Sequence, residues 1–482
     1  MTAFYSSAIS NRKPKAQMTP AAQHALAAKV TAGVIFAGFV FSLAANLPGH
    51  MSFDSVIQLV EGRTGAYAGW HPPVTSWLLG LLDAILPGTA LFVVLDTLLI
   101  YGCLWLLLRL AGQASWAAAA LAFFAALTPQ YLIYPGIVWK DILFSGSAVA
   151  GFVALACAAQ AWPRLYVRNA WLGFALMLLI VASLARQNGI LLLLGGILGF
   201  AWIALRQENL SLRNAALWGG CALLAAIVIF TAANVALGTR LTKEYGGARQ
   251  FRLLQAYDII AALAARPDLA LDKLDTQDPT LAREMRTDGV RLYTPQRNDP
   301  LAGSQPLQDA LTAVPPPLLR AQWFSLILHH PLLYLSSRAD MFRWVLFTPQ
   351  IDKCLPFTVG VQGPQDELDR VDMDPRWDDR DDFLQSYGNR FEGTPVFQHG
   401  LFALLAAIAA FILLRRRRTA DIAIAAMQVS ALVYTASFFA ISIACDYRYL
   451  YALDLAAVTG WFYLALDWHW PERQLRAFLR GR

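Results

Sequence analysis

Charged residues are scarce in this chain. Asp, Glu, Lys and Arg together make up 15% of its 482 residues, whereas 57% are hydrophobic and the mean hydropathy is +0.44. A soluble protein of this length cannot bury so much apolar surface, so the excess must face lipid. The formal net charge of +6 comes from short basic clusters between apolar runs, which indicate membrane topology rather than a nucleic-acid partner.

Cysteines and cofactor motifs are also few. Three of the five cysteines lie inside apolar runs, and none has the spacing of a metal site. Cys354 and Cys445 could meet outside the membrane, but two cysteines make no disulfide framework, so pairing is not the favoured interpretation. The sequence has no convincing glycine-rich phosphate loop, Walker pattern or dinucleotide fingerprint. It therefore predicts no cofactor.

Long apolar runs, by contrast, are abundant. A helix needs about 20 apolar residues to cross the hydrocarbon core of a membrane. The segment 73–86 is too short, so we expect a helix in the membrane interface or an extension of the next span. The sequence predicts an all-α polytopic membrane protein with about ten transmembrane helices. The segments expected to span are 28–47, 89–109, 116–134, 142–161, 170–186, 189–205, 215–237, 396–414, 420–444 and 449–467.

Basic residues in the short loops give the orientation. They alternate so that all the clusters fall on one side, which the positive-inside rule makes the cytoplasm. The clusters lie at 11–15, 163–169, 206–214, 415–418 and 473–482. Residues 1–27 are then a cytoplasmic tail, and the first span is a retained anchor because its apolar core is too long for a cleaved signal peptide. Frequent Ala and Arg with few Lys indicate a bacterial source, so we expect the inner membrane, with a periplasmic outer face.

The chain divides at the ends of its apolar runs. Residues 28–237 form a transmembrane core with a first external loop at 48–88. Residues 238–395 are too long for a structureless connection, so we expect a small external α-rich domain between spans 7 and 8. Spans of the C-terminal part cover 396–467, and 468–482 is a basic cytoplasmic tail. The acidic run at 364–383 lacks the spacing of a calcium loop and is interpreted as a solvated loop.

Three basic residues are expected on the outer side, against the positive-inside pattern. Lys140, Arg186 and Arg448 each lie within a residue or two of a span, where a charge costs on the order of 2.5–3.5 kcal/mol. Each could pair with a neighbouring acid, Asp141 or Asp446, and reach the surface with its long side chain. Gathered on one face, however, the three favour an anion site at the membrane surface, suited to a phosphate carried on a lipid.

Several motifs at this face resemble those of the GT-C superfamily of membrane glycosyltransferases. Asp54 in "FDS" occupies the acidic position of the first external loop, and "WHPPVTSWLLG" the Pro-Pro position that follows it. "WKD" at 139–141 follows in the second external loop, which is often functional in such enzymes. "ILHHPLLYLSSR" and "DYRYLYALDL" look like features of bacterial members, and the resemblance covers about residues 28–237. It implies sugar transfer from a polyprenyl-phosphate donor. Many members have paired acids where this chain has one, and a single carboxylate holds a divalent ion poorly, so a metal is not supported.

The residue inventory suits this reaction on chemical grounds as well. A phosphate leaving group needs cations rather than an acid, so one base for the acceptor hydroxyl suffices. We assign Asp54 as general base, with helix capping as its alternative role. The donor phosphate is assigned to Lys140, Arg186, Arg448 and His71, although His71 could simply pack at a helix start. Substrate is oriented by Asp141, Asp446, Tyr447 and Trp139, with Tyr449 as a further aromatic, although interfacial aromatics also anchor membrane helices.

The expected partners are a polyprenyl-phosphate sugar, a lipid or glycan acceptor of the cell envelope, and membrane lipids, without nucleic acid. An O-antigen-type polymerase or ligase is a rival, because Arg338 and Arg343 are spaced for one helix face in the long external segment. A lipid or solute transporter is another, with Asp96 and Gln428 inside spans. A receptor or structural membrane protein is the remaining class.

Overall fold

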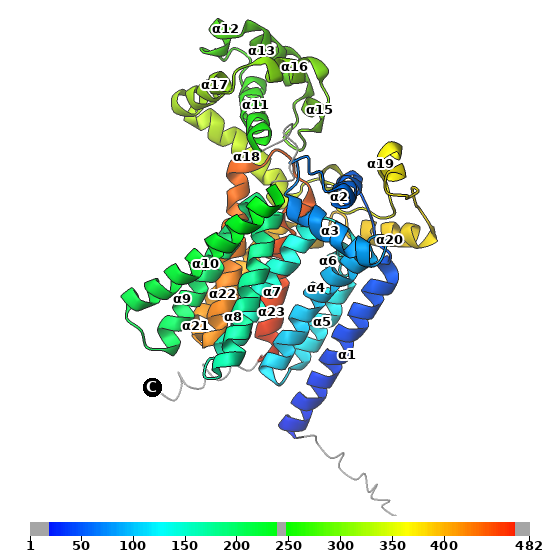
Figure 1. Cartoon of the computed structure of the whole chain (residues 1–482), viewed down its shortest axis with the longest axis vertical. Helices are drawn as coiled ribbons and strands as arrows, with labels where there is room; N and C mark the ends of the chain where they lie inside the picture. The colour runs from blue at the N-terminus through cyan, green and yellow to red at the C-terminus, as the bar shows by residue number, and fades with distance from the viewer. Residues whose placement is uncertain (1–18, 239–246, 468–482) are drawn as a thin grey trace, which may run out of the picture.

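The structure is a computed structural model that describes residues 19–238 and 247–467. The two predicted cytoplasmic tails lie largely or wholly outside the described residues, which leave out 1–18 and 468–482. The described residues form helices and three isolated β-bridges, and no extended strand. A bundle of long helices carries a group of shorter helices at one end, at the top of Figure 1. We call that end of the bundle the domain face, and the opposite end, where Arg415–Arg418 lie, the basic face.

The long helices confirm the prediction of an all-α polytopic membrane protein. Among the described residues, nine helices are long and apolar enough to cross a membrane, and a tenth span results if one bent pair is counted. That pair is α5 (Trp116–Leu127) and the following Pro129–Gly136, which meet at 78°. The other spans are α1 (Pro20–Asn46), α4 (Ala90–Ala111), α7 (Lys140–Gln160), α8 (Leu165–Ala185), α9 (Ile190–Gln207, extended from Gln187), α10 (Leu212–Gly238), α21 (His399–Arg416), α22 (Thr419–Ile441) and α23 (Tyr451–Leu466, extended from Tyr447).

Helix α7 is the centre of the bundle. The whole of its apolar window is buried, and it packs against α4, α8, α22 and α23. Its small residues permit this, since a Cβ added at Gly151 would lie 2.8 Å from Leu179 of α8. The first two residues of α7, Lys140 and Asp141, therefore start at the domain face in the middle of the bundle rather than at its edge.

The segment 48–88, predicted as the first external loop, packs over one end of the bundle. It forms α2 (Phe53–Thr64) and α3 (Pro73–Ile85), the short apolar helix expected not to span. The backbones of the two helices touch, because a Cβ added at Gly62 would lie 2.4 Å from the Ser76 carbonyl oxygen. A parallel β-bridge between His50 and Ile137 fixes the start of the loop next to α7. The residues at the start of α2 are thereby placed beside those at the start of α7.

The group of shorter helices at the domain face follows α10. Around one core of its own it packs α11 (Gly247–Ala265) against α17 (Pro316–His329) and α18 (Pro331–Phe347). The remaining α-helices of this group are α12 (Leu274–Gln277), α13 (Pro279–Glu284), α14 (Val290–Leu292), α15 (Asp299–Ala302) and α16 (Gln305–Ala313). Helices α19 (Gln365–Asp369) and α20 (Asp379–Asn389) complete the segment before α21 and lie apart from the group, toward α2 (Figure 1).

Two predictions about this segment are wrong. Arg338 and Arg343 do not share an exposed helix face: Arg338 is fully buried and pairs with Asp258 of α11 at 2.5 Å, whereas Arg343 is exposed. The acidic run is not merely a solvated loop, because Asp381 of α20 is fully buried. It accepts a hydrogen bond from the Gly360 amide and pairs with His50 at 3.3 Å. Arg376, five residues before Asp381, lies 3.3 Å from its carboxylate and compensates that charge, whereas the partner of Arg338 is distant in the chain.

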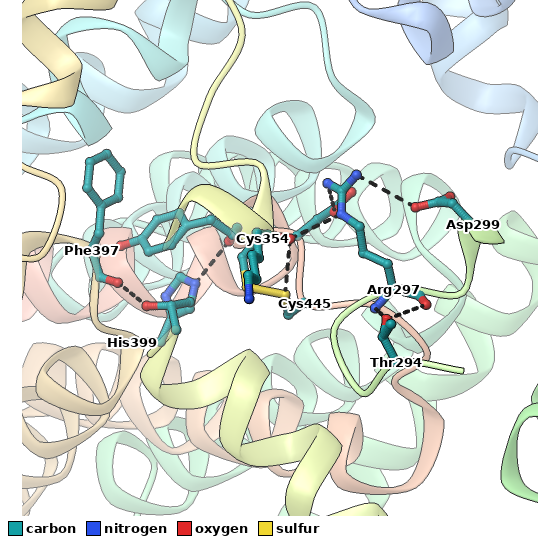
Figure 2. Close-up of a disulfide and its surroundings, with 11 residues drawn as sticks. Thr294, Arg297, Asp299, Cys354, Phe397, His399 and Cys445 are labelled. Carbon is teal, nitrogen blue, oxygen red and sulfur yellow. Dashed lines mark hydrogen bonds and ion pairs between the residues drawn. A yellow bond between two sulfur atoms is a disulfide. The ribbon is translucent and has the colours of Figure 1, made fainter. Parts of the chain in front are cut away.

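The structure also joins Cys354 and Cys445 in a disulfide, against the sequence interpretation (Figure 2). The two residues are 91 positions apart, but the chain returns Cys445 to the domain face at the end of α22, beside the segment that follows α18. The disulfide thus fastens the external segment to the turn that precedes α23. Arg297 strengthens the same junction, because its Nε donates to the Lys353 carbonyl and its Nη2 lies 3.3 Å from Asp446.

Candidate functional site

A polar cavity of about 420 Å³ lies at the domain face, between the bundle and α11. Acidic and basic residues from six separate parts of the chain line it. They are Asp54, His71, Lys140, Arg186, Asp299, Asp446 and Arg448. All but Asp299 were singled out in the sequence, and the structure brings them together around one volume.

Asp54 lies in the first turn of α2, where the capping box of Ser52 and Ser55 fixes the helix start. The helix is therefore capped by Ser52, and the carboxylate of Asp54 is free to face the cavity. Its Oδ2 accepts a hydrogen bond of 2.6 Å from Arg448 Nη2, and its Oδ1 lies 3.6 Å from His71 Nε2. Its side chain is 24% exposed, so it remains accessible from the cavity.

Arg448 is the most heavily bonded cation of the site. Besides Asp54, its Nη2 lies 3.2 Å from Asp446 and its Nε lies 3.7 Å from Asp141. Its guanidinium also lies over the ring of Trp139, 4.7 Å from the ring centre. Contacts on several sides hold this group in one orientation, as a planar fork allows.

Lys140 is the least committed cation of the site. Its ammonium donates to Nδ1 of His71 over 2.9 Å, and among the described residues it forms no ion pair with a carboxylate. An ammonium has only donors, so Nδ1 of His71 accepts, and the ring hydrogen lies on Nε2, toward Asp54. His71 itself is fixed by Pro72 and Pro73, which begin α3. A ligand anion would find in Lys140 an amino group that pairs with no protein carboxylate, and the anion itself would favour the positive charge of that group.

Arg186 lies opposite, at the end of α8. Its guanidinium pairs with Asp141, which is fully buried and does not line the cavity. It also lies over the ring of Tyr449, 5.0 Å from the ring centre. Asp141 thus orients both Arg186 and Arg448 from beneath the cavity.

The charges of the site set its protonation. Burial alone would raise the pKa of Asp54, but the positive charge of Arg448, with His71 and Lys140, lowers it to about 2. Burial and the nearby Lys140 lower the pKa of His71 to about 3, against the effect of Asp54. Burial raises the pKa of Asp446 despite Arg448 and Arg297. At neutral pH, Asp54 is therefore a carboxylate and His71 a neutral imidazole.

Two of the aromatic candidates do not line the cavity. Trp139 lies beneath Arg448 and donates from its indole nitrogen to Ser52, 2.8 Å away. Tyr447 is fully buried on the other side of its turn, where its hydroxyl donates to Asp454 over 2.6 Å and its ring stacks on His399. Both support cavity residues, and Tyr449 is the aromatic of this turn that lines the cavity.

Sequence reasoning missed a polar and aromatic group at the cavity mouth. Trp70 and Phe251 are both partly exposed, and Gln187 and Gln250 join them. Gln187 Nε2 donates to Gln250 Oε1 over 2.8 Å, and Gln250 Nε2 donates to the Trp70 carbonyl over 2.6 Å. The polar pair at 187–188 between two spans was the available signal. Nothing in the sequence marks Gln250 and Phe251, because they belong to a helix outside the bundle.

The site offers little to a metal ion. Across 19–238 and 247–467, no group of three or more His, Cys, Asp or Glu side chains is arranged to hold one. Asp54 and Asp446 of the cavity, and Asp141 beneath it, lie within ion-pair distance of Arg448, and Asp299 lies 3.7 Å from Arg297. The arrangement can bind an anion beside a carboxylate.

No protein-family model and no curated protein matches the chain. Among solved structures it is similar to the archaeal oligosaccharyltransferase AglB from Archaeoglobus fulgidus in complex with an inhibitory peptide and a dolichol-phosphate. The TM-score is 0.40 at 14% identity, over 94% of this chain and 51% of that one. The same organism's oligosaccharyltransferase in the apo form gives 0.40 at 13% identity, over 93% and 52%. This chain spans about half the length of those proteins, and scores this low say nothing about individual site residues.

Proposed function

We propose that this protein is a membrane glycosyltransferase of the GT-C type that moves a sugar from a polyprenyl-phosphate donor to an acceptor of the cell envelope. The observation that carries the proposal is the convergence of Asp54 with Lys140, Arg186 and Arg448 around one cavity at the membrane surface. A lipid-linked phosphate would lie at this depth with its chain in the bilayer. No nucleotide-binding element is then required.

In the proposed reaction the cations bind the phosphate that leaves with the lipid. The anomeric carbon passes through an oxocarbenium-like state, and the departing phosphate oxygen gains negative charge. Cations already in place around that oxygen stabilise it without reorganisation. Lys140 supplies the uncommitted charge, while Arg186 and Arg448 are held ready by Asp141.

Asp54 is the proposed general base, and its protonation must change for that role. A carboxylate with a pKa of about 2 is a weak base, because Arg448 and Lys140 stabilise its charged form. A bound phosphate anion would compensate those same cations and so raise the pKa of Asp54. The base would therefore become effective only when the donor is bound.

The acceptor would enter from the cavity mouth. Trp70 and Phe251 offer partly exposed ring faces, and Gln187 and Gln250 offer amides beside them. Aromatic faces with adjacent amides are suited to sugar rings and their hydroxyls. We place this mouth on the periplasmic side of a bacterial inner membrane, because the basic loops lie at the opposite end of the bundle.

The rival functions have less support. A polymerase or ligase built on Arg338 and Arg343 would need both at a site, yet Arg338 is buried against Asp258 and its Nη1 donates to the Ser442 carbonyl. A transporter would need polar groups facing a path through the bundle. Asp96 is fully buried, and Gln428 Nε2 donates to the Ala456 carbonyl.

The test is reconstitution in lipid vesicles with a panel of radiolabelled polyprenyl-phosphate sugars and an envelope extract as acceptor. The wild type should remove label from at least one lipid donor, and Asp54→Asn should remove it at least about 10²-fold more slowly. Equal rates for the two proteins would remove Asp54 as the base. A wild type that consumes no member of the panel would count against the reaction itself.

A further inference from the structure

A second polar cavity, of about 280 Å³, lies at the basic face. It is formed where α4, α7 and α23 end and where α21 turns into α22. Its polar lining residues are Gln113, Gln160, Arg416, Arg418, Thr419 and Asp467. None of them lines the candidate active site, which lies at the other end of the same helices.

Arg416 is built into the wall of this cavity. It is only 2% exposed, and its Nη2 and Nε donate to the two carboxylate oxygens of Asp421 over 2.8 and 3.1 Å. Its remaining Nη1 is buried and has no hydrogen-bond acceptor within the described part of the chain. A guanidinium donor left without an acceptor in a buried place is costly, so a ligand oxygen there would be stabilising.

The start of α22 adds further donors. This helix of 23 residues begins at Thr419, and Thr419 and Ala420 both line the cavity. The first amides of a helix have no acceptor within the helix, and they form the positive end of its dipole. The amide of Arg418 is already bonded to Asp421, 3.1 Å away, which leaves the amides that follow it for a ligand.

Arg418 supplies a positive charge that can be redirected. Its side chain is half exposed and pairs with Asp467 at 2.9 Å. Exposed ion pairs of this kind are weak, so an anion in the cavity can compete for the guanidinium. Asp467 is the single carboxylate among the described residues that line the cavity. The hydrogen-bond donors of the cavity come from two arginines, two glutamines and the start of a helix.

The remaining wall of the cavity is apolar, formed by Leu110, Ala111, Tyr463 and Leu466. All of these residues stand at the ends of helices that are long and apolar enough to cross a membrane, so we expect them at the depth of lipid headgroups. We propose that this cavity binds the phosphate group of an anionic phospholipid, with Arg416, Arg418 and the start of α22 as its ligands. A free phosphate ion offers the same oxygens, but the apolar wall and the position at the bilayer surface favour the lipid.

The test uses the full chain purified in detergent, with phosphatidylglycerol as the probe and native mass spectrometry as the measurement of bound lipid. Arg418→Gln should weaken retention of phosphatidylglycerol about tenfold, as expected for one charge-assisted hydrogen bond. Arg415→Gln is the matched control, because it removes the same charge from the same basic run but does not line the cavity. It should leave retention near that of the wild type.

A second variant tests the cavity without changing any charge. Ala111→Phe places a ring in the volume and should also release phosphatidylglycerol, while both variants remain folded by their thermal unfolding profiles. Equal losses for Arg415→Gln and Arg418→Gln would show diffuse surface attraction and overturn the site. Thermal stabilisation by inorganic phosphate alone, with no preference for phosphatidylglycerol over phosphatidylcholine, would overturn the lipid as the source of the phosphate. None of these outcomes depends on glycosyl transfer.

Discussion

Arg448 and Asp54 are 394 residues apart in the chain, yet Arg448 Nη2 donates to Asp54 Oδ2 over 2.6 Å. The pair fastens the first external loop to the turn before the last membrane helix, and both residues line the same cavity. Removing either group would leave the charge of the other partly buried and without its ion-pair partner. The geometry of the candidate site therefore depends on this contact.

Replacing Arg448 by lysine should distinguish the effect of the positive charge from the effect of the shape of the guanidinium. Lysine keeps the positive charge but cannot bond to Asp54 and Asp446 while reaching toward Asp141, as the guanidinium does. We expect donor turnover to fall roughly 10²-fold, in line with the loss of one preorganised stabilising group. The measurement is release of radiolabel from the lipid donor. Arg297→Lys, which alters a second contact to Asp446, is the control, and an equal loss there would contradict a special role for Arg448.

The free energy of unfolding should depend on pH in a way that reflects the low pKa of Asp54. Its pKa falls from the usual 3.8 to about 2 in the folded chain, so the charged form contributes to folding above about pH 4. That contribution is lost as the pH falls through about 2. We expect the wild type to exceed Asp54→Asn in free energy of unfolding by about 2 kcal/mol at pH 7, and the difference to shrink in acid. Unfolding measured across this range would contradict the ion pair if the difference stayed constant.

The membrane helices could be predicted because the lipid imposes them. A span must be apolar for about 20 residues whatever it packs against. Segments such as 142–161 and 420–444 can therefore be recognised from their own sequence. The bend between α5 and α6 (Pro129–Leu132) had a signal in the sequence, because Thr128, Pro129 and Gln130 interrupt the apolar run 116–134 and a proline ends or kinks a helix. The packing of the bundle decides the angle of the bend.

The site could be predicted in part because its cations are costly where they stand. Lys140, Arg186 and Arg448 break the apolar pattern at span ends, and the structure gathers them. One partner could be predicted from a neighbouring acid, since Arg448 lies 3.2 Å from Asp446. Pairs such as Arg448 with Asp54 or Arg338 with Asp258 could not, because they join helices far apart in the chain. Tyr447 shows the same limit: neighbouring residues of one turn face opposite ways, and Asp446, Arg448 and Tyr449 face the cavity whereas Tyr447 does not.

Removing the Cys354–Cys445 disulfide should destabilise the protein and weaken the structure that holds the candidate site. Cys354–Cys445 closes a long loop and lies directly before Asp446, which bonds to Arg448. We expect Cys354→Ser with Cys445→Ser to lower the free energy of unfolding by about 2–5 kcal/mol and to raise the KM for the donor. Cys221→Ser, which alters an exposed free cysteine, should change neither. An unaltered KM in the double variant would mean that Asp446 and Arg448 are held by the turn alone.

Tyr447 should position the site without touching the substrate. Its hydroxyl donates to buried Asp454 over 2.6 Å, just as the Tyr463 hydroxyl donates to buried Asp421 over 2.8 Å at the basic face. Tyr447→Phe and Tyr463→Phe each remove a hydrogen bond to a buried carboxylate, so both should cost about 1–3 kcal/mol of stability. Tyr447→Phe should cost more, because the Tyr447 hydroxyl also accepts a hydrogen bond from Gln130 Nε2 over 2.9 Å. Only Tyr447→Phe should slow donor turnover, because Tyr447 holds the turn that carries Asp446 and Arg448. Thermal unfolding and radiolabel release measured on both variants in phosphatidylcholine vesicles make the comparison. Equal turnover in the two variants would show that the turn keeps its shape without this bond.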